Sequence, residues 1–145
     1  MTLTHYSQTV NISATPGLVW SVMSDVERWP EWTASISKVK SLSGGLLQVG
    51  SRVRIQQPKL PPAIWRVTEL NPGFSFTWVS RAPGVCVTAL HAMEALDTGS
   101  CVTLSIDYQG LLGSLVARWV GELNERYLRM EADGLQARCA ALTSK

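Results

Sequence analysis

The chain has 145 residues, of which 46% are hydrophobic and 17% are charged, and its formal net charge is +2. This composition predicts one globular domain over residues 1–145 and excludes a disordered chain, because the apolar residues suffice for a core. The thirteen basic residues form no run or helical stripe, and no apolar run approaches the roughly 18 residues of a membrane span, so we expect neither nucleic-acid binding nor membrane insertion.

The start of the chain predicts a strand followed by two short helices. Alternating residues indicate a strand over about Leu3–Ile12. Thr15 and Pro16 then suit the N-cap and the first position of a helix that ends near Asp25. A second short helix, or a single turn, is expected over residues 26–32, where a proline interrupts it.

Six further strands follow, and the breaks between them contain glycine or proline. Because their connections are short, these strands should pair antiparallel. After the last strand the apolar period changes from two to about 3.6, which predicts a long helix from about Leu111 to Leu142. The predicted strands are Ile36–Leu42, Arg52–Gln57, Ile64–Leu70, Phe74–Ser80, Val85–Leu96 and Cys101–Gln109.

The phase of each element predicts which side chains face the interior. His91 and Met93 are placed inward, because the opposite phase of their strand would bury Glu94. Other residues expected to face inward are Phe74, Phe76 and Trp78 in one strand, Val102, Leu104, Ile106 and Tyr108 in another, and Leu112, Leu115, Val116, Trp119, Leu123, Tyr127, Met130 and Leu135 on the helix.

In its order of elements, the chain resembles the START-like (SRPBCC) superfamily, in the branch of polyketide cyclases/dehydrases and lipid-transport proteins. The resemblance covers nearly the whole chain and is carried by "ISATPGLVWSVMSDVERWPEW", "WRVTELNPGFSFTW", "PGVCVTALHAMEAL" and "GSCVTLSIDYQGLLG". It implies an α+β helix-grip fold, in which a seven-stranded antiparallel sheet wraps around a long C-terminal helix, with two short helices between the first two strands. It also implies an elongated ligand cavity between the sheet and that helix.

Eight residues are candidates for lining this cavity. Aromatic side chains supply apolar area and, in Trp and Tyr, a polar tip. His91 is the candidate acid or base, and Arg81 is a candidate for the cavity rim because it precedes a loop. Asp107 and Glu69 are assigned to the solvated face. The expected ligand-binding residues are Trp65, Phe76, Trp78, Arg81, His91, Tyr108, Trp119 and Tyr127.

Three functional hypotheses remain open from the sequence. The preferred one is a non-enzymatic protein that binds a small hydrophobic or aromatic, lipid-like or polyketide-like molecule, because no nucleophile pairs with His91. The second is a cyclase/aromatase-type enzyme that uses His91 as acid or base, and the third is a module that binds a protein partner. We expect no metal or cofactor and a cytoplasmic location, because Cys86, Cys101 and Cys139 are far apart and fit reduced thiols.

Overall fold

The computed structural model describes residues 4–143. Within this range, one antiparallel sheet of seven strands runs in the order β1-β7-β6-β5-β4-β3-β2. The elements are β1 (Thr4–Ile12), α1 (Pro16–Ser24), the 3-10 helix η1 (Val26–Glu31), β2 (Lys38–Ser41), β3 (Arg52–Gln56), β4 (Ala63–Asn71), β5 (Ser75–Ala82), β6 (Val85–Leu96), β7 (Gly99–Gln109) and α2 (Gly113–Thr143). The predicted order of elements and the α+β helix-grip fold are confirmed.

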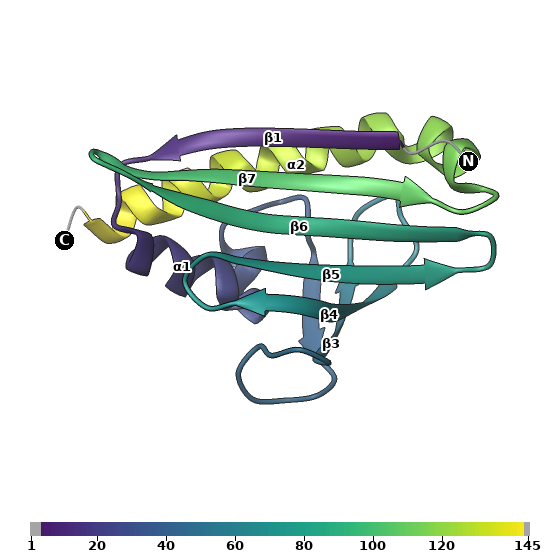
Figure 1. Ribbon diagram of the computed structural model, residues 1–145, viewed down its shortest axis with the longest axis horizontal. Coiled ribbons are helices and arrows are strands. Elements are labelled where there is room, and N and C mark those ends of the chain that lie inside the picture. The colour runs from purple at the N-terminus through teal and green to yellow at the C-terminus, as the bar shows by residue number, and fades with distance from the viewer. Residues whose placement is uncertain (1–3, 144–145) are drawn as a thin grey trace.

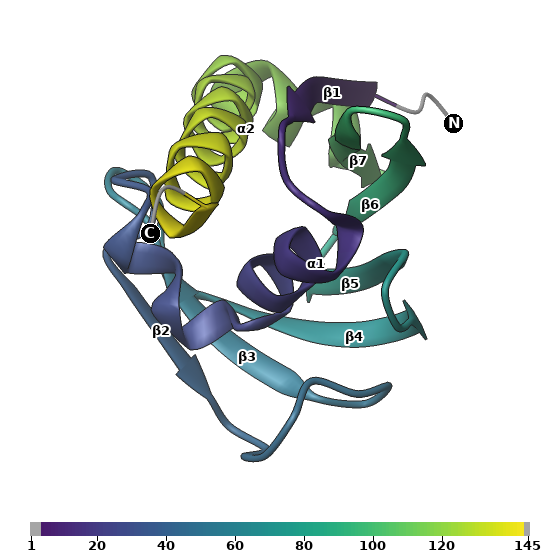
Figure 2. The same ribbon diagram turned by 90° about the vertical axis from the view of Figure 1, so that its left-hand side faces the viewer.

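The sheet curls around the helices, with α2 lying along its concave side and α1 beside it (Figures 1 and 2). β1 pairs with β7 from Thr4↔Tyr108 to Ile12↔Ser100, which places the first and last strands of the sequence side by side. The register between β4 and β5 shifts between Val67 and Glu69. Such a bulge bends a strand and increases its twist, which suits a sheet that must wrap around a helix.

Local chemistry explains how the first helix starts. The side chain of Thr15 accepts a hydrogen bond from the backbone N–H of Leu18 at 3.3 Å, and Pro16 occupies the first helical position. Both features satisfy or remove donors that have no partner inside the helix. Val19, Val22 and Met23 are buried on the inner face of α1, which anchors it against the sheet.

An aromatic cluster fills the interior beside α1. Trp29 from η1 lies 5.4 Å from Trp78 and 6.4 Å from Phe76, measured between ring centroids. Its Nε1–H donates to the backbone oxygen of Met23 at 3.0 Å, so the buried indole has a partner for its polar atom. The cluster continues to Trp65, which lies 5.9 Å from Trp78.

The predicted length of the terminal helix is confirmed, but its predicted inward stripe is partly wrong. Leu112, Leu115 and Trp119 are 46%, 48% and 80% exposed. The residues that face the sheet in these turns are Gly113, Ala117 and Gly121, because the helix runs too close to β1 and β7 for larger side chains. A methyl group on Gly121 would collide with the hydroxyl of Tyr6. Farther along the helix, the predicted inward residues Tyr127 and Leu135 are buried.

Phe74 is also placed differently from the prediction. Its side chain is 67% exposed. The residue belongs to the turn before β5, where its N–H donates to the oxygen of Asn71 at 2.9 Å, and strand alternation begins only at Ser75. The other inward assignments on β5, β6 and β7 are confirmed, including those of His91 and Met93. Among residues 4–143, no helix is both long enough and apolar enough to cross a membrane.

Candidate functional site

A cavity of about 240 Å³ lies between the inner face of the sheet and α2. β5, β6 and β7 form one wall, α2 forms the opposite wall, and the loop between β3 and β4 closes one side. Most lining side chains are apolar or aromatic, and a few carry polar groups. The apolar and aromatic ones are Trp29, Ile36, Ile55, Leu60, Pro61, Ala63, Trp65, Trp78, Val87, Ala89, Ile106, Tyr108, Val116, Val120, Tyr127 and Leu128; the others are Gln57, Ser80, His91, Asn124 and Glu131.

The structure brings together five of the eight predicted site residues. Trp65, Trp78, His91, Tyr108 and Tyr127 all line the cavity. Their role in binding a ligand stays a prediction. The convergence follows from strand alternation, because each strand residue occupies an inward position of β4, β5, β6 or β7.

The other three predicted residues lie outside the cavity lining. Phe76 is fully buried behind His91, where the two rings stack with centroids 4.3 Å apart. Arg81 is exposed near the end of β5. The prediction for Trp119 is wrong: its side chain is 80% exposed on the outer face of α2, because Gly121 and Ala117 take the sheet-facing positions of these turns.

His91 lies in a box of aromatic rings at the floor of the cavity. Besides Phe76, the ring contacts Trp78 edge-on at 5.2 Å and Trp29 at 5.3 Å. The side chain is 4% exposed, and its Nδ1 has no hydrogen-bond partner among the described residues. Burial lowers the pKa of His91 from 6.5 to about 3, and a hydrogen bond with the backbone of Phe76 opposes this shift. The imidazole is therefore neutral at physiological pH.

Glu131 on α2 is a site residue that the sequence analysis missed. Its side chain is 7% exposed and lines the same cavity as His91. The hydroxyl of Ser35 donates to its Oε2 at 3.3 Å, and Ser35 in turn contacts the hydroxyl of Thr33 at 2.7 Å. Burial raises the pKa of Glu131 from 4.5 to about 8, although the bond from Ser35 lowers it. Near neutral pH the side chain is thus mainly a carboxylic acid, able to donate a hydrogen bond.

The sequence did contain a signal for Glu131. It lies four residues after Tyr127 and four before Leu135, and both were predicted to face inward. Residues at this spacing share one face of a helix, so the periodicity placed an acidic group on the buried side. The general expectation that acidic residues are exposed outweighed that signal.

Two tyrosine hydroxyls complete the polar lining. Asn124 on α2 donates to the hydroxyl of Tyr108, and Tyr127 donates to the backbone oxygen of Pro58 in the loop between β3 and β4. Burial raises the pKa of Tyr108 to about 12, with the bond from Asn124 acting in the opposite direction. The Tyr108 phenol therefore does not serve as a base near neutral pH. Asn124 was also missed from the sequence, since amides have no distinctive spacing.

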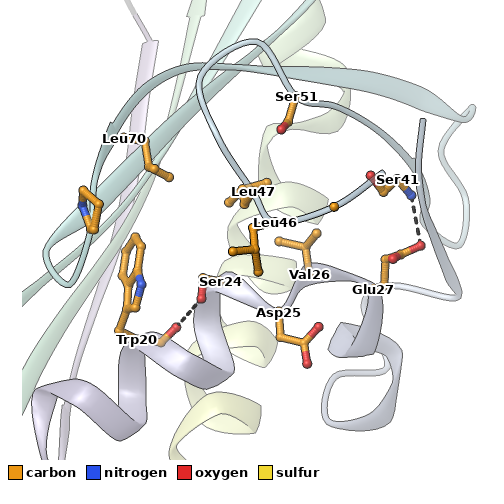
Figure 3. A pocket seen from close by; sticks show the side chains of 12 residues that line it. Trp20, Ser24, Asp25, Val26, Glu27, Ser41, Leu46, Leu47, Ser51 and Leu70 are labelled. Carbon is orange, nitrogen blue, oxygen red and sulfur yellow. Dashed lines mark hydrogen bonds between the residues drawn. The ribbon is translucent and has the colours of Figure 1, made fainter. Parts of the chain in front are cut away.

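A second pocket, of about 540 Å³, lies outside this cavity between α1, η1 and the loop after β2. Figure 3 shows the side chain of Leu46 between Trp20 and Val26, above Asp25. Glu27 at its edge accepts a hydrogen bond from the backbone N–H of Ser41 at 3.1 Å. Leu46 is 90% exposed. This pocket is an open outer cleft and includes none of the predicted site residues.

The cavity presents mainly apolar surface and a few uncharged hydrogen-bonding groups. Among residues 4–143, no three His, Cys, Asp or Glu side chains come close enough to hold a metal ion. The carboxylates assigned to the solvated face lie away from the cavity: Asp107 pairs with His5 on the outer side of the sheet, and Glu69 is exposed. The arrangement is suited to holding an uncharged molecule that has a polar tip.

Comparisons with known proteins place this geometry in context. A family model described as polyketide cyclase / dehydrase and lipid transport matches residues 4–140. The comparison with curated proteins found no match.

Several solved structures share the fold at low sequence identity. An aromatase/cyclase, Zhui from Streptomyces sp. R1128, aligns with a TM-score of 0.78 and 19% identity over 96% of this chain and 94% of its own. A START superfamily protein from Mycobacterium smegmatis aligns with a TM-score of 0.73 and 19% identity, over 95% of this chain and 98% of its own. The major latex-like protein 151 of Panax ginseng aligns with a TM-score of 0.76 and 15% identity, over 94% of this chain and 97% of its own. At these identities the likeness shows the fold alone.

Proposed function

The chain belongs to the polyketide cyclase/dehydrase and lipid transport family, and we propose that it binds a small, uncharged, hydrophobic or aromatic molecule without transforming it. The observation that carries this proposal is the cavity between the sheet and α2. Its volume of about 240 Å³ is slightly below the roughly 300–1,000 Å³ of typical small-molecule pockets. A compact ring system fits such a space better than a long acyl chain.

The electrostatics of the cavity support an uncharged ligand. His91 is neutral because its pKa is lowered to about 3, and Glu131 is mainly protonated because its pKa is raised to about 8. Within the described part of the chain, no cationic side chain lines the cavity. A ligand carboxylate would be buried there without a counter-charge, which is costly. A hydroxyl or carbonyl group, by contrast, finds both donors and acceptors.

Calorimetric titration with a matched pair of probes tests the proposal. We expect 2-naphthol to bind at least about tenfold more tightly than 2-naphthoate, because only the second carries a charge into the cavity. Val120→Trp, which adds bulk at the cavity wall, should abolish 2-naphthol binding, whereas Leu115→Trp on the exposed face should leave it unchanged. Equal affinity for both probes, or equal behaviour of both variants, would contradict the proposal.

A cyclase/aromatase-type activity is the second candidate, and Glu131 is the observation that favours it. A general acid works best when its pKa lies near the operating pH. Glu131, with a pKa of about 8, meets this condition, and His91, with a pKa of about 3, does not. If the protein turns over a poly-β-ketone, Glu131→Gln should slow it by about 10²–10⁴-fold and His91→Asn far less. The absence of turnover in the wild type would leave the binding function.

Cytoplasmic location is part of the proposal. Cys86 on β6 and Cys101 on β7 are free thiols, as is Cys139 on α2. Cys86 pairs in register with Gln109, and Cys101 with Glu94, so the two strand cysteines are not neighbours. Free thiols are typical of reducing compartments.

A further inference from the structure

Four large apolar side chains lie uncovered at the beginning of α2. Leu111 is 91% exposed, Leu112 46%, Leu115 48% and Trp119 80%. We call these four residues the α2 patch. Leu115 and Trp119 are four residues apart on one side of the helix, and Leu111 and Leu112 lie in the turn that directly precedes it. The opposite side of these turns packs on the sheet, and Leu112 also packs against Gly84, so the fold uses the patch only in part.

The patch lies at one end of the sheet, where the β5–β6 hairpin meets the start of α2 (Figure 1). The N–H of Leu112 donates to the oxygen of Gly84 in that hairpin at 2.7 Å. Val116 and Val120, on the same turns of α2 as Leu115 and Trp119, line the ligand cavity. The patch therefore forms the outer surface of the helix whose inner surface closes the cavity.

The charges around the patch favour an anionic partner. Arg118 directly precedes Trp119, and Arg81 lies on the hairpin that contacts Leu112; both side chains are exposed. The first turn of α2 contains no acidic residue, so the helix N-terminus adds uncompensated partial positive charge. Glu122 follows one turn after Arg118 on the same face and offsets part of this charge.

A second exposed apolar side chain, Leu46, has different surroundings. Leu46 is 90% exposed in the loop after β2, but Asp25 and Glu27 line the cleft beneath it (Figure 3). Acidic side chains repel an anionic surface. Leu46 therefore provides a matched control, since it is an exposed leucine of similar accessibility to Leu111 in an acidic setting.

The dimensions of the patch argue against a stable dimer. Four side chains make a surface on the order of a few hundred Å², within the range of the largest patch on a typical monomer. A standard protein interface buries about 800 Å² on each partner. Beyond Trp119, the same face of α2 continues with the charged residues Glu122, Arg126 and Arg129, so the apolar surface does not extend along the helix.

We propose that the α2 patch docks the protein peripherally onto an anionic lipid bilayer, with Trp119 and the three leucines in the headgroup region and Arg118 and Arg81 facing lipid phosphates. Tryptophan suits this region because one end of the side chain is apolar and the other is polar. Arginine suits it because its planar fork pairs with phosphate oxygens. The docking does not depend on which ligand occupies the cavity, and it goes beyond the proposed binding function.

Vesicle flotation tests the proposal with the full chain. We expect binding to vesicles of equal parts phosphatidylcholine and phosphatidylglycerol, weaker binding to phosphatidylcholine alone, and loss of the difference at high salt, since screening acts on exposed charges. Trp119→Ser should weaken binding about tenfold. Arg118→Glu should weaken binding to the mixed vesicles only, and Leu46→Ser should change nothing. Unchanged circular dichroism would show that the variants remain folded.

Three outcomes would overturn the proposal. The first is a wild-type protein that does not float with mixed vesicles at low salt. The second is an equal loss of binding in Leu46→Ser and Trp119→Ser. The third is a concentration-dependent dimer, measured by light scattering, that Trp119→Ser disrupts, because the patch would then be covered by a second copy of the chain.

Discussion

The first half of α2 buries small side chains, and the second half buries mainly large ones. In the half that starts at Gly113, the sheet-facing residues are small, and the large apolar residues Leu115 and Trp119 face outward. In the half that starts at Tyr127, large residues such as Leu128 and Leu135 face inward. The outer face is charged there, as at Arg129 and Asp133.

The difference follows from the distance between helix and sheet. A methyl group on Gly113 would lie 3.3 Å from the backbone of Tyr108, and one on Gly121 would collide with the hydroxyl of Tyr6. Close approach of the helix therefore excludes large side chains from the first turns. In the later turns, large side chains such as Leu128 and Leu135 fill the space between α2 and the rest of the fold. Side-chain size follows available space here, and hydrophobicity alone does not identify the buried face.

The largest effect expected from this comparison is on stability. Leu135→Ala should lower the free energy of unfolding by about 2–5 kcal/mol, because the side chain is 1% exposed and its loss leaves a cavity. Trp119→Ser removes a larger side chain but should change the free energy by less than about 0.5 kcal/mol. Urea unfolding of both variants measures this, and a Trp119→Ser loss as large as that of Leu135→Ala would refute the outward assignment.

The glycines on α2 allow a second test. Gly134→Ala should cost about 1–3 kcal/mol, because the new methyl group meets the backbone oxygen of Trp32, which cannot move freely. Gly121→Ala should cost less, since its methyl group meets the tip of the Tyr6 side chain, which can move, whereas both variants gain about 1 kcal/mol of helix propensity. Thermal or urea unfolding ranks the two variants. The reverse order would show that the first half of the helix is the more tightly packed.

The pH dependence of stability tests the two buried titratable side chains of the cavity, His91 on β6 and Glu131 on α2. The folded state raises the pKa of Glu131 from 4.5 to about 8, so it holds extra protons in that window and loses stability as the pH rises through it. The folded state lowers the pKa of His91 from 6.5 to about 3, so it loses stability as the pH falls through that window. The two slopes cancel between pH 4.5 and 6.5, where stability should be greatest.

Above pH 6.5 only the effect of Glu131 remains, and stability should fall by about 1.4 kcal/mol per pH unit up to pH 8. Glu131→Gln should abolish this fall, and the loss due to His91 should then begin at pH 6.5, because no opposing slope remains. His91→Asn serves as the complementary control: it should remove the acid-side loss, and the fall due to Glu131 should then begin at pH 4.5. A wild-type stability that does not change between pH 6.5 and 8 would show that Glu131 is solvated.

The smallest effect is expected where the two halves of α2 meet. Asn124 donates to the hydroxyl of Tyr108, and Asn124→Ala or Tyr108→Phe should each cost about 1 kcal/mol of unfolding free energy. The double variant should cost less than the sum of the two, because both remove the same hydrogen bond. Additive losses in this cycle would mean that the contact contributes nothing to the joining of α2 and β7.

Much of the fold was predictable because strands and helices carry local signals. β6 was predicted with its observed bounds, Val85–Leu96, and β3 to within one residue. Alternation placed His91 and Tyr108 on the inner face of the sheet correctly. The candidate site was predicted less completely, because an amide such as Asn124 has no distinctive spacing and an acidic residue such as Glu131 is expected to be exposed.

The sequence by itself determined the order of the elements, the antiparallel pairing and the inward face of the strands, since these depend on neighbours along the chain. The tertiary structure alone decided that Trp119 faces outward and that Glu131 is buried beside Ser35. Both outcomes depend on how close residues distant in sequence approach α2: Tyr6 and Tyr108 leave no room beside Gly121 and Gly113, and Ser35 offers a hydroxyl to a carboxyl group 96 positions away. Local periodicity carries no information about such distances.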